Sequence, residues 1–448
     1  MNIKGKKISI VGAVRSGVAA AKLCKRHGAI PYVSDYSPAD KIPDSVEVLK
    51  SSGIDYETGG HSDKVYDCDL LVTSPGVPSD APVLKNAIAK GIEVISELEF
   101  AFRFYKGTII AITGTNGKTT TTSLMAFVLE KCGKKVYTAG NIGFAFSEIA
   151  DRAEEESFVS LEISSFQLDF INSFKPRYSM ILNITPDHLD RYENSFDNYR
   201  NSKYGITRYQ SSDDIFIYNS DDTKSEIEKI NSKASLRTFS LNEKVANGAY
   251  FDGENLVIAN GGKVTPVMSK QEASLKGEHN IYNMLAVLTV AADLNLDLDK
   301  VKAAMREFPG VEHRLEFVRE LDGVKYVNDS KATNVDSVWY ALRTFDEPLL
   351  LILGGKDKGN DYNEIKEPVE KHVRKIYAIG SSKDKVYDYF NSFIEVEKVD
   401  TMEDCVLKCK KDAKSGEVVL LSPACASFDM FKSYEHRGKV FKQAVNQL

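Results

Sequence analysis

The residues that point most directly to chemistry stand between Thr113 and Thr120, where the chain reads TGTNGKTT. An apolar run precedes this stretch, and a helical pattern over Thr119–Glu130 follows it. A glycine-rich turn between a buried strand and a helix directs backbone N–H groups and a helix N-terminus at anionic oxygens. Lys118 is then placed for nucleotide phosphates and the Thr119 hydroxyl for Mg²⁺. Because Ile112 replaces the first glycine of the usual pattern, a turn that only caps a helix is the competing interpretation.

A carboxylate and a histidine follow two other apolar runs. Glu162 ends one run, and Asp187 and His188 come just after a second run that closes at Ile184. A carboxylate in an apolar run is costly without a partner, and Mg²⁺ binds carboxylate oxygens together with phosphates. A structural ion pair is the alternative for Glu162, and an ordinary hydrogen-bonded histidine is the alternative for His188. Taken together with Thr119, these residues favour a metal site.

Two further polar residues carry less information by themselves. Asn141 lies in the sequence GNIG after a strand-like run, and an asparagine in a loop is more often a turn former than a ligand. Lys203 lies in YRNSKY, and neither its spacing nor its surroundings distinguish it from an ordinary lysine on a helix surface.

The last third of the chain repeats the pattern of polar groups after apolar runs. Arg314 follows the Pro-Gly pair at 309–310, an expected linker from which an arginine can reach nucleotide phosphates. The stretches DSKATN from Asp329, GGKDKG from Gly354 and SPACASFD from Ser422 each follow an expected strand. Small residues there leave room for a substrate and lysines attract carboxylates, although generic loop chemistry explains each stretch equally well.

The first glycine-rich turn, Gly12 to Gly17, reads GAVRSG, and Asp35 follows at the distance of a ribose-binding acid. The pattern departs from G-x-G-x-x-G. An NAD site is therefore weakly supported, and a pyrophosphate or UDP site is equally compatible.

These motifs require parallel sheets to position them. Short apolar runs alternate with helical patterns in three blocks, which predicts an α/β fold of three domains at 1–96, 97–308 and 309–448. We expect two Rossmann-like blocks to flank a central nucleotide-binding block with a mostly parallel sheet. The polar stretch 246–267 predicts hairpins on a surface insert. Strands are expected at 7–12, 30–34, 69–73, 92–95, 108–113, 158–163, 180–184, 215–218, 324–328, 349–353, 375–379 and 418–422.

Composition limits the possible partners. The 448 residues are 42% hydrophobic and 27% charged with a net charge of −6, so no global positive field attracts nucleic acid or anionic lipid. No apolar run is long enough to span a membrane. The six scattered cysteines form no C-x-x-C pair, and Cys405 and Cys409 fit one face of a helix better than a metal site. We therefore expect a cytoplasmic protein.

Several of these motifs together resemble one family. TGTNGKTTT, GNIG, LEISSFQLD, TPDHLDRY, HRLEF, DSKATN, LGGKDKG and SPACASFDMF occur in the order seen in the Mur ligases. The GTNGKT loop is shared with the folylpolyglutamate synthases, whereas DSKATN and SPACAS are similar to the branch of Mur ligases that adds D-glutamate. The resemblance covers nearly the whole chain. It implies ATP-dependent joining of D-glutamate to UDP-N-acetylmuramoyl-L-alanine through an acyl phosphate, in peptidoglycan precursor synthesis, by a monomer.

The resemblance also implies roles for individual residues. Glu162, His188, Lys203 and Thr119 would support two Mg²⁺ ions, with Lys203 carbamylated, and Lys118 would act on the phosphates. The residues implied to bind ATP are Gly114, Thr115, Asn116, Gly117, Lys118, Thr119, Thr120, Asn283, Arg314, Asp329 and Lys331. The UDP-sugar would contact Ser16, Gly17, Asp35, Ser37, Ser74, Pro75, Gly76 and Asn141. D-glutamate would contact Thr333, Lys358, Ser427 and Tyr434.

Three other readings stay open. A ligase of the same superfamily with a different amino acid is the nearest. A P-loop regulatory NTPase would hydrolyse ATP without any amino acid. An NAD-dependent oxidoreductase would use the Gly12 turn and have no use for Lys118.

Overall fold

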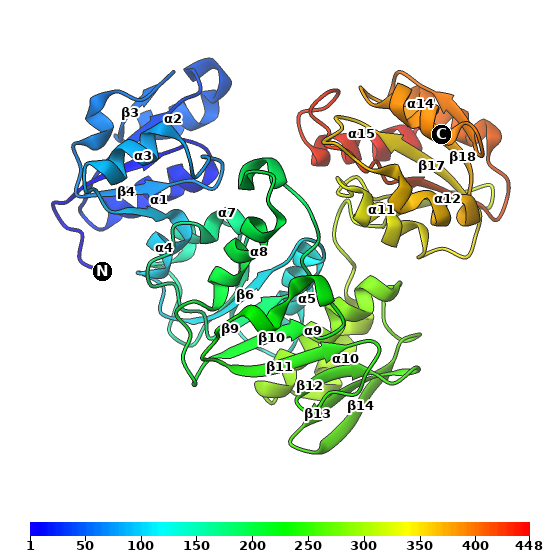
Figure 1. The fold of residues 1–448 in the computed structure, drawn as a ribbon, viewed down its shortest axis with the longest axis horizontal. Coiled ribbons are helices and arrows are strands. Elements are labelled where there is room, and N and C mark those ends of the chain that lie inside the picture. The colour runs from blue at the N-terminus through cyan, green and yellow to red at the C-terminus, as the bar shows by residue number, and fades with distance from the viewer. The chain divides into compact units, whose positions relative to one another are not determined.

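The computed structural model describes all 448 residues and contains three mainly parallel sheets (Figure 1). The chain divides into two compact units. The first unit comprises Met1–Glu272 and Tyr282–Glu307, and the second comprises Ala273–Ile281 and Phe308–Leu448. The predicted class, α/β with mostly parallel sheets in three domains, is confirmed. No helix combines the length and apolar character that crossing a membrane requires.

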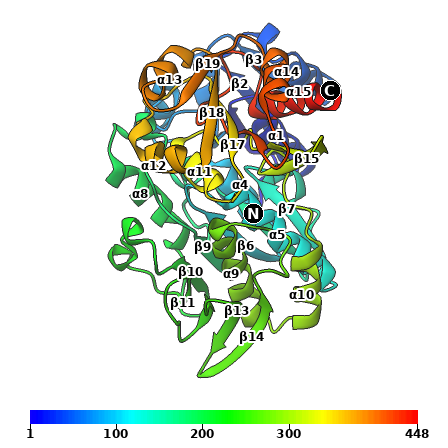
Figure 2. The same cartoon turned by 90° about the vertical axis from the view of Figure 1, so that its right-hand side faces the viewer.

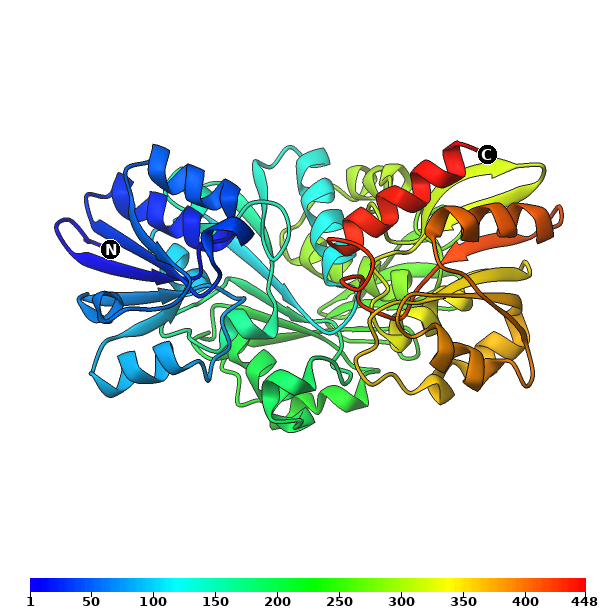
Figure 3. The same ribbon diagram turned by 90° about the horizontal axis from the view of Figure 1, so that it is seen from above.

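The first sheet has five parallel strands in the order β3-β2-β1-β4-β5. Its strands are β1 (Lys7–Val11), β2 (Ile30–Asp35), β3 (Asp55–Thr58), β4 (Leu70–Thr73) and β5 (Val94–Ser96). Helices α1 (Arg15–Arg26) and α2 (Pro43–Ser51) pack on one face and α3 (Pro82–Ala89) on the other, as the blue part of Figure 3 shows. Helix α4 (Glu97–Phe102) leads to the central sheet.

The central sheet has nine strands in the order β14-β13-β12-β11-β10-β9-β6-β8-β7. They are β6 (Thr108–Thr113), β7 (Val136–Gly140), β8 (Phe158–Glu162), β9 (Tyr178–Ile181), β10 (Ile215–Asn219), β11 (Ser235–Ser240), β12 (Gly248–Phe251), β13 (Asn255–Asn260) and β14 (Lys263–Ser269). Its helices are α5 (Lys118–Lys131), α6 (Phe146–Ile149), α7 (Ser165–Leu168), α8 (Phe196–Tyr204), α9 (Glu278–Asp293) and α10 (Leu298–Glu307). The predicted hairpins exist, but β12–β14 extend this sheet and do not form a separate insert.

The third sheet has the order β15-β16-β20-β17-β18-β19, and only β15 is antiparallel to its neighbour. The strands are β15 (Glu316–Leu321), β16 (Val324–Asn328), β17 (Leu349–Gly354), β18 (Val373–Ile379), β19 (Glu395–Lys398) and β20 (Val418–Leu421). Helices α11 (Val335–Leu342), α12 (Lys366–His372) and α13 (Lys383–Phe390) cover one face, and α14 (Met402–Asp412) and α15 (Tyr434–Asn446) cover the other (Figure 2). Cys405 and Cys409 are buried on α14 as free thiols, which confirms the helix-face interpretation.

Candidate active site

The predicted strand–loop–helix arrangement of the phosphate loop is confirmed. The loop joins β6 to α5, and Gly117 precedes the helix with φ 82°, where a Cβ would lie 2.4 Å from Oδ1 of Asn283. Only glycine fits that position. The Lys118 Nζ donates to the backbone oxygens of Gly114 and Thr115, each at 2.8 Å, so its charge is held directly over the loop. Asn283, predicted to contact ATP, therefore lies against this loop.

The segment after β9 fixes the other side of the phosphate loop. The Asn116 amide donates to Oδ1 of Asn183 at 2.8 Å, and the Thr115 hydroxyl donates to the Thr185 oxygen at 2.9 Å. Thr119 and Thr120 are buried in the first turn of α5. The loop is therefore a preformed cradle whose backbone groups are oriented by neighbouring strands.

Glu162 combines burial with an unused oxygen. It ends β8 with 1% of its surface exposed. Its Oε1 accepts from the Asn141 Nδ2 at 2.7 Å, whereas its buried Oε2 has no hydrogen-bond partner in the protein. A buried carboxylate oxygen without a donor is costly, and a hard cation is the partner that it suits. Glu162 forms no ion pair in the structure, which disfavours the alternative of a structural pair.

Asp187 and His188 lie in a loop and not at the strand end where we expected them, because β9 closes at Ile181. His188 takes the left-handed conformation, with φ 52°, just before the short helical turn Leu189–Tyr192. Its ring stands edge-on to Phe166 at 5.4 Å between centroids, and its Nε2 is 3.7 Å from Oδ2 of Asp187. The imidazole is thus oriented by an aromatic ring and a carboxylate.

The interpretation of Lys203 as a helix-surface lysine is wrong. The residue is 1% exposed, and its Nζ donates to the Gly114 oxygen of the phosphate loop at 2.9 Å. Burial lowers the pKa of Lys203 well below its ordinary value, the charge of Lys118 lowers it further, and Asp187 and Glu162 act in the opposite direction. The sequence of α8 is mostly polar and gives no sign of this burial, because the burial comes from a tertiary contact between α8 and the phosphate loop.

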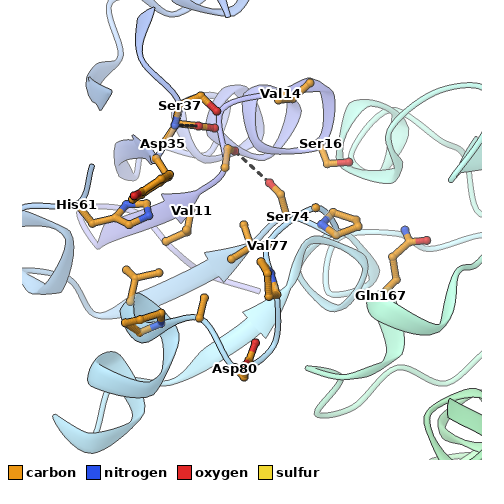
Figure 4. Close-up of a pocket in the computed structure, with 18 of the residues that line it drawn as sticks. Val11, Val14, Ser16, Asp35, Ser37, His61, Ser74, Val77, Asp80 and Gln167 are labelled. Atoms are coloured by element: carbon orange, nitrogen blue, oxygen red, sulfur yellow. Dashed lines mark hydrogen bonds between the residues drawn. The ribbon is translucent and has the colours of Figure 1, made fainter. Parts of the chain in front are cut away.

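A cavity of about 980 Å³ opens beside the first glycine-rich turn (Figure 4). In Figure 4, Asp35, Ser37 and His61 lie at one end, and Ser16 and Gln167 lie toward the other. The predicted substrate residues that line it are Ser16, Asp35, Ser37, Ser74, Pro75, Gly76 and Asn141. The Asp35 carboxylate accepts from the backbone amides of Ala13 at 2.6 Å and Ser37 at 2.7 Å, so it also shapes the turn.

Gly17 is the one predicted substrate residue of the first sheet that does not line the cavity. A Cβ there would lie 1.7 Å from the Gly12 oxygen, so glycine is required for α1 to pack on the turn. Conversely, sequence reasoning missed Tyr36 and His61, whose rings face each other at 6.3 Å on the cavity wall. Neither ring lies in a motif that could have indicated it.

In the second unit, the structure brings Arg314 and Asp329 together. Asp329 is 1% exposed, and its carboxylate accepts from the Ser422 hydroxyl at 2.9 Å and the Leu315 amide at 3.2 Å. Arg314 NH1 lies 3.8 Å from Oδ1 of Asp329. Burial raises the pKa of Asp329 to about 6, and Arg314 and the hydrogen bonds only partly oppose this.

Lys331 and Tyr434 also meet, because the Lys331 Nζ lies 5.3 Å above the Tyr434 ring. Arg437, which the sequence did not single out, anchors this region: it is 1% exposed and donates to the Ser330 hydroxyl and to the Ser330 and Cys425 backbone oxygens. Burial lowers the pKa of Arg437 to about 10.

The loop that carries Lys358 is tied to the loop that carries Ser427. Lys356 and Ala426 exchange backbone hydrogen bonds of 2.8 and 3.1 Å, and the Asn360 side chain donates to the Ala424 oxygen at 3.0 Å. Lys358 is exposed and Thr333 is half-buried. The structure shows no hydrogen bond or ion pair from either residue to Ser427 or Tyr434, the other predicted D-glutamate contacts.

One other group in the second unit has the composition of a metal site. Ligand atoms of Glu312, His313 and Glu316 lie within 4.8 Å of one another. The Lys442 Nζ, however, already bridges the two carboxylates at 2.7 and 2.8 Å. This ammonium neutralises the cluster, which we interpret as structural.

Comparison with known proteins follows the same three parts of the chain. Family models match residues 6–96 ("Mur ligase MurD-like, N-terminal domain"), 112–291 ("Mur ligase middle domain") and 313–425 ("Mur ligase, glutamate ligase domain"). The chain is 41% identical to the UDP-N-acetylmuramoylalanine--D-glutamate ligase of Salinibacter ruber, over 100% of this chain and 99% of that protein. It is 42% identical to the enzyme of the same name from Chloroherpeton thalassium, with the same coverage.

Solved structures give the same fold. The UDP-N-acetylmuramate-alanine ligase MurC of Thermotoga maritima matches with a TM-score of 0.63 at 21% identity, covering 99% of both chains. A pseudomurein peptide ligase type C from Methanothermus fervidus matches with a TM-score of 0.60 at 18% identity, covering 99% of this chain and 100% of that one. With the phosphate loop, the buried Glu162 and full-length relatives in agreement, the chain belongs to the Mur ligase family.

Proposed function

We propose that this protein joins D-glutamate to UDP-N-acetylmuramoyl-L-alanine and converts ATP to ADP and phosphate. The observation that carries the proposal is the gathering of Lys118, Glu162 and Lys203 around one phosphate loop next to a cavity of about 980 Å³. Relatives that bear the name of this reaction match over the full length of the chain. Because the step consumes ATP, the cytoplasm is the expected compartment.

The donor set around the loop fits divalent cations. Glu162 offers an unpartnered buried oxygen, and Thr119 and His188 add a hydroxyl and an imidazole. We propose that they hold two Mg²⁺ ions, which supply positive charge to the transferring phosphoryl group. The lowered pKa favours the neutral form of the Lys203 amine, which is the form that adds to CO₂; the carbamate and one proton are the products. The carbamate would add a carboxylate-like ligand.

The chain's own groups account for the chemical steps. The L-alanyl carboxylate attacks the γ-phosphate of ATP, and ADP leaves. Lys118, held over the loop, neutralises charge on the group in transfer. The acyl phosphate is then attacked by the neutral amine of D-glutamate, with loss of a proton, and the resulting tetrahedral intermediate expels phosphate to leave the amide. Asn141 and the cavity wall hold the UDP-sugar so that its carboxylate faces Glu162 and the loop.

The second unit is proposed to supply the remaining contacts. Arg314, Asp329 and Lys331 would bind ATP, and Thr333, Lys358, Ser427 and Tyr434 would bind D-glutamate. The domain boundaries 1–96, 97–308 and 309–448 remain part of this proposal, as does a monomeric state. Limited proteolysis tests the boundaries, and light scattering tests the mass of the particle.

Phosphate release is the decisive measurement. The purified protein is incubated with ATP, Mg²⁺ and UDP-N-acetylmuramoyl-L-alanine against a panel of D- and L-amino acids. We expect turnover that depends on D-glutamate and on the UDP-sugar. Equal turnover without any amino acid would instead identify a regulatory NTPase, and turnover with another amino acid would identify a sister ligase.

A further inference from the structure

Arg15 joins the first sheet to the loop that carries Asn141. It begins α1, directly after the first glycine-rich turn. Its guanidinium NH2 donates to the Gly140 oxygen at 2.7 Å, and its NH1 donates to the Gly143 oxygen at 3.1 Å. A planar fork that spans two carbonyl oxygens of one loop fixes the position of that loop more strictly than a single bond does. Arg15, Gly140 and Asn141 all line the 980 Å³ cavity.

The peptide unit between Gly140 and Asn141 continues the connection to Glu162. Its carbonyl accepts from Arg15, and its N–H, on Asn141, donates to the Glu162 backbone oxygen at 2.9 Å. The Asn141 side chain then donates to Oε1 of Glu162 at 2.7 Å. Hydrogen bonds at both ends of one peptide polarise each other. Arg15 is therefore linked through this peptide to the backbone of Glu162, and through the Asn141 side chain to the Glu162 carboxylate.

The Gly140–Asn141 peptide lies so close to β8 that its position can vary little. Gly140 has φ 100°, and a Cβ on it would lie 2.2 Å from the Glu162 oxygen. At the far end of the loop, Ser147 donates its amide to the carboxylate of the buried Glu97, which begins α4, at 2.7 Å. The segment 140–147 is thus held by Arg15 of α1 near its start and by Glu97 of α4 near its end.

We propose that Arg15 is a positioning residue that orients the free oxygen of Glu162 through Gly140 and Asn141. Cation binding at the central sheet then depends on how the first sheet and its helix α1 pack against the loop that carries Asn141. The inference rests on the proposed function, because it assigns the cation site to Glu162. Arg15 touches neither Glu162 nor the phosphate loop. Its effect is therefore expected on cation affinity and loop order, and to a smaller extent on the binding of the UDP-sugar.

The test compares Arg15→Leu, which removes the guanidinium donors and leaves a shorter apolar side chain, with Arg15→Lys. Lys22→Leu is the matched control, since it removes one exposed positive charge from the same helix. Mn²⁺ affinity is measured by electron paramagnetic resonance without substrates. Binding of UDP-N-acetylmuramoyl-L-alanine is measured by calorimetry in EDTA, and hydrogen exchange is followed over residues 140–147.

For Arg15→Leu we expect Mn²⁺ affinity to fall about tenfold, as for other groups that orient a metal ligand. Exchange over 140–147 should accelerate, Arg15→Lys should recover part of the loss, and Lys22→Leu should behave as wild type. Unchanged Mn²⁺ affinity and exchange in Arg15→Leu would overturn the proposal. If the UDP-sugar affinity in EDTA were the only property to fall, Arg15 would be a substrate ligand and the proposal would equally be wrong.

The two proposals fail in different ways. If the wild-type protein released no phosphate with D-glutamate, the proposed function would fail, whereas the Mn²⁺ and exchange comparison would still decide the role of Arg15. If turnover were normal and Arg15→Leu bound Mn²⁺ as tightly as wild type, only the role of Arg15 would fail.

Discussion

The charged groups around the phosphate loop and those around Asp329 are equally buried but are neutralised differently. Glu162 and Lys203 are each 1% exposed; one oxygen of Glu162 has no hydrogen-bond partner, and the Lys203 Nζ donates to a backbone oxygen. Asp329 and Arg437 are also 1% exposed, but Asp329 faces two donors and an arginine, and Arg437 has three acceptors.

This difference in hydrogen-bond partners indicates that the first region binds a ligand and that the second holds its loops in place. A polar group that is buried without its partner destabilises the fold, so it persists where a ligand completes it. The phosphate loop of the first unit fits that description. The cluster of the second unit is complete without a ligand, and it is suited to hold the surrounding loops in one conformation. We therefore expect substitutions in the first region to affect chemistry and those in the second to affect stability and substrate affinity.

The largest effect is expected from Lys118→Ala. The substitution removes the positive charge held over the loop, whereas the loop itself is fixed by Asn183 and Thr185 and should keep its shape. Phosphate release should fall by roughly 10³-fold, the order seen when a positioned transition-state donor is lost. The thermal unfolding temperature serves as the control and should stay near that of wild type. Substantial turnover in a folded variant would remove the phosphate-loop assignment.

The next largest effect is expected from Lys203→Met. Methionine fills similar space but can form no carbamate, so activity should fall about 100-fold through lost metal support. Because the buried amine has a lowered pKa, its removal should not destabilise the fold, and the unfolding temperature should hold or rise. Steady-state rates and calorimetry on one preparation check both expectations. A near-wild-type rate would contradict the carbamate assignment.

Asp329→Asn tests the second region through pH. The folded pKa of Asp329 is about 6 against an ordinary 3.8, so between these values the folded state holds a proton that the unfolded state has lost. The contribution of this carboxyl to wild-type stability therefore falls as pH rises from about 4 to 6 and is level above, and the fall amounts to about 3 kcal/mol. The difference in unfolding temperature, variant minus wild type, should increase across that window. Parallel curves would show that the carboxyl ionises normally.

The interior of the fold was largely predictable from sequence, and its edges were not. Strands β6 and β16 have the bounds that their apolar runs predicted. Three missed strands, β3, β15 and β19, are at sheet edges, where exposed polar residues leave no apolar run to recognise. Strand β11 was also missed although it lies inside the central sheet, because its mixed sequence SLRTFS contains no apolar run. The alternation of apolar runs and helical patterns therefore predicts the fold class, but it does not predict the full strand order of each sheet.

The same limit applies to the site. Motifs at strand ends, such as the loop around Lys118 and the carboxylate of Glu162, follow from local sequence because a strand end determines where they point. The burial of Lys203 depends on how α8 packs against the phosphate loop, which the local sequence does not specify. Arg437, Tyr36 and His61 lie outside any recognisable motif, and only tertiary contacts reveal them.

The smallest effect is expected from Lys358→Ala, which tests whether the second region contributes only to substrate affinity. Lys358 is exposed, so water screens its attraction for a carboxylate of D-glutamate, and such a contact contributes about 1 kcal/mol or less. The KM for D-glutamate should rise about fivefold, while kcat and the KM for ATP stay within about twofold. Lys356→Ala, on the same loop and also exposed, is the matched control. A fall in kcat that matches the fall in kcat/KM would place Lys358 in the chemical step and would break the division of tasks between the two regions.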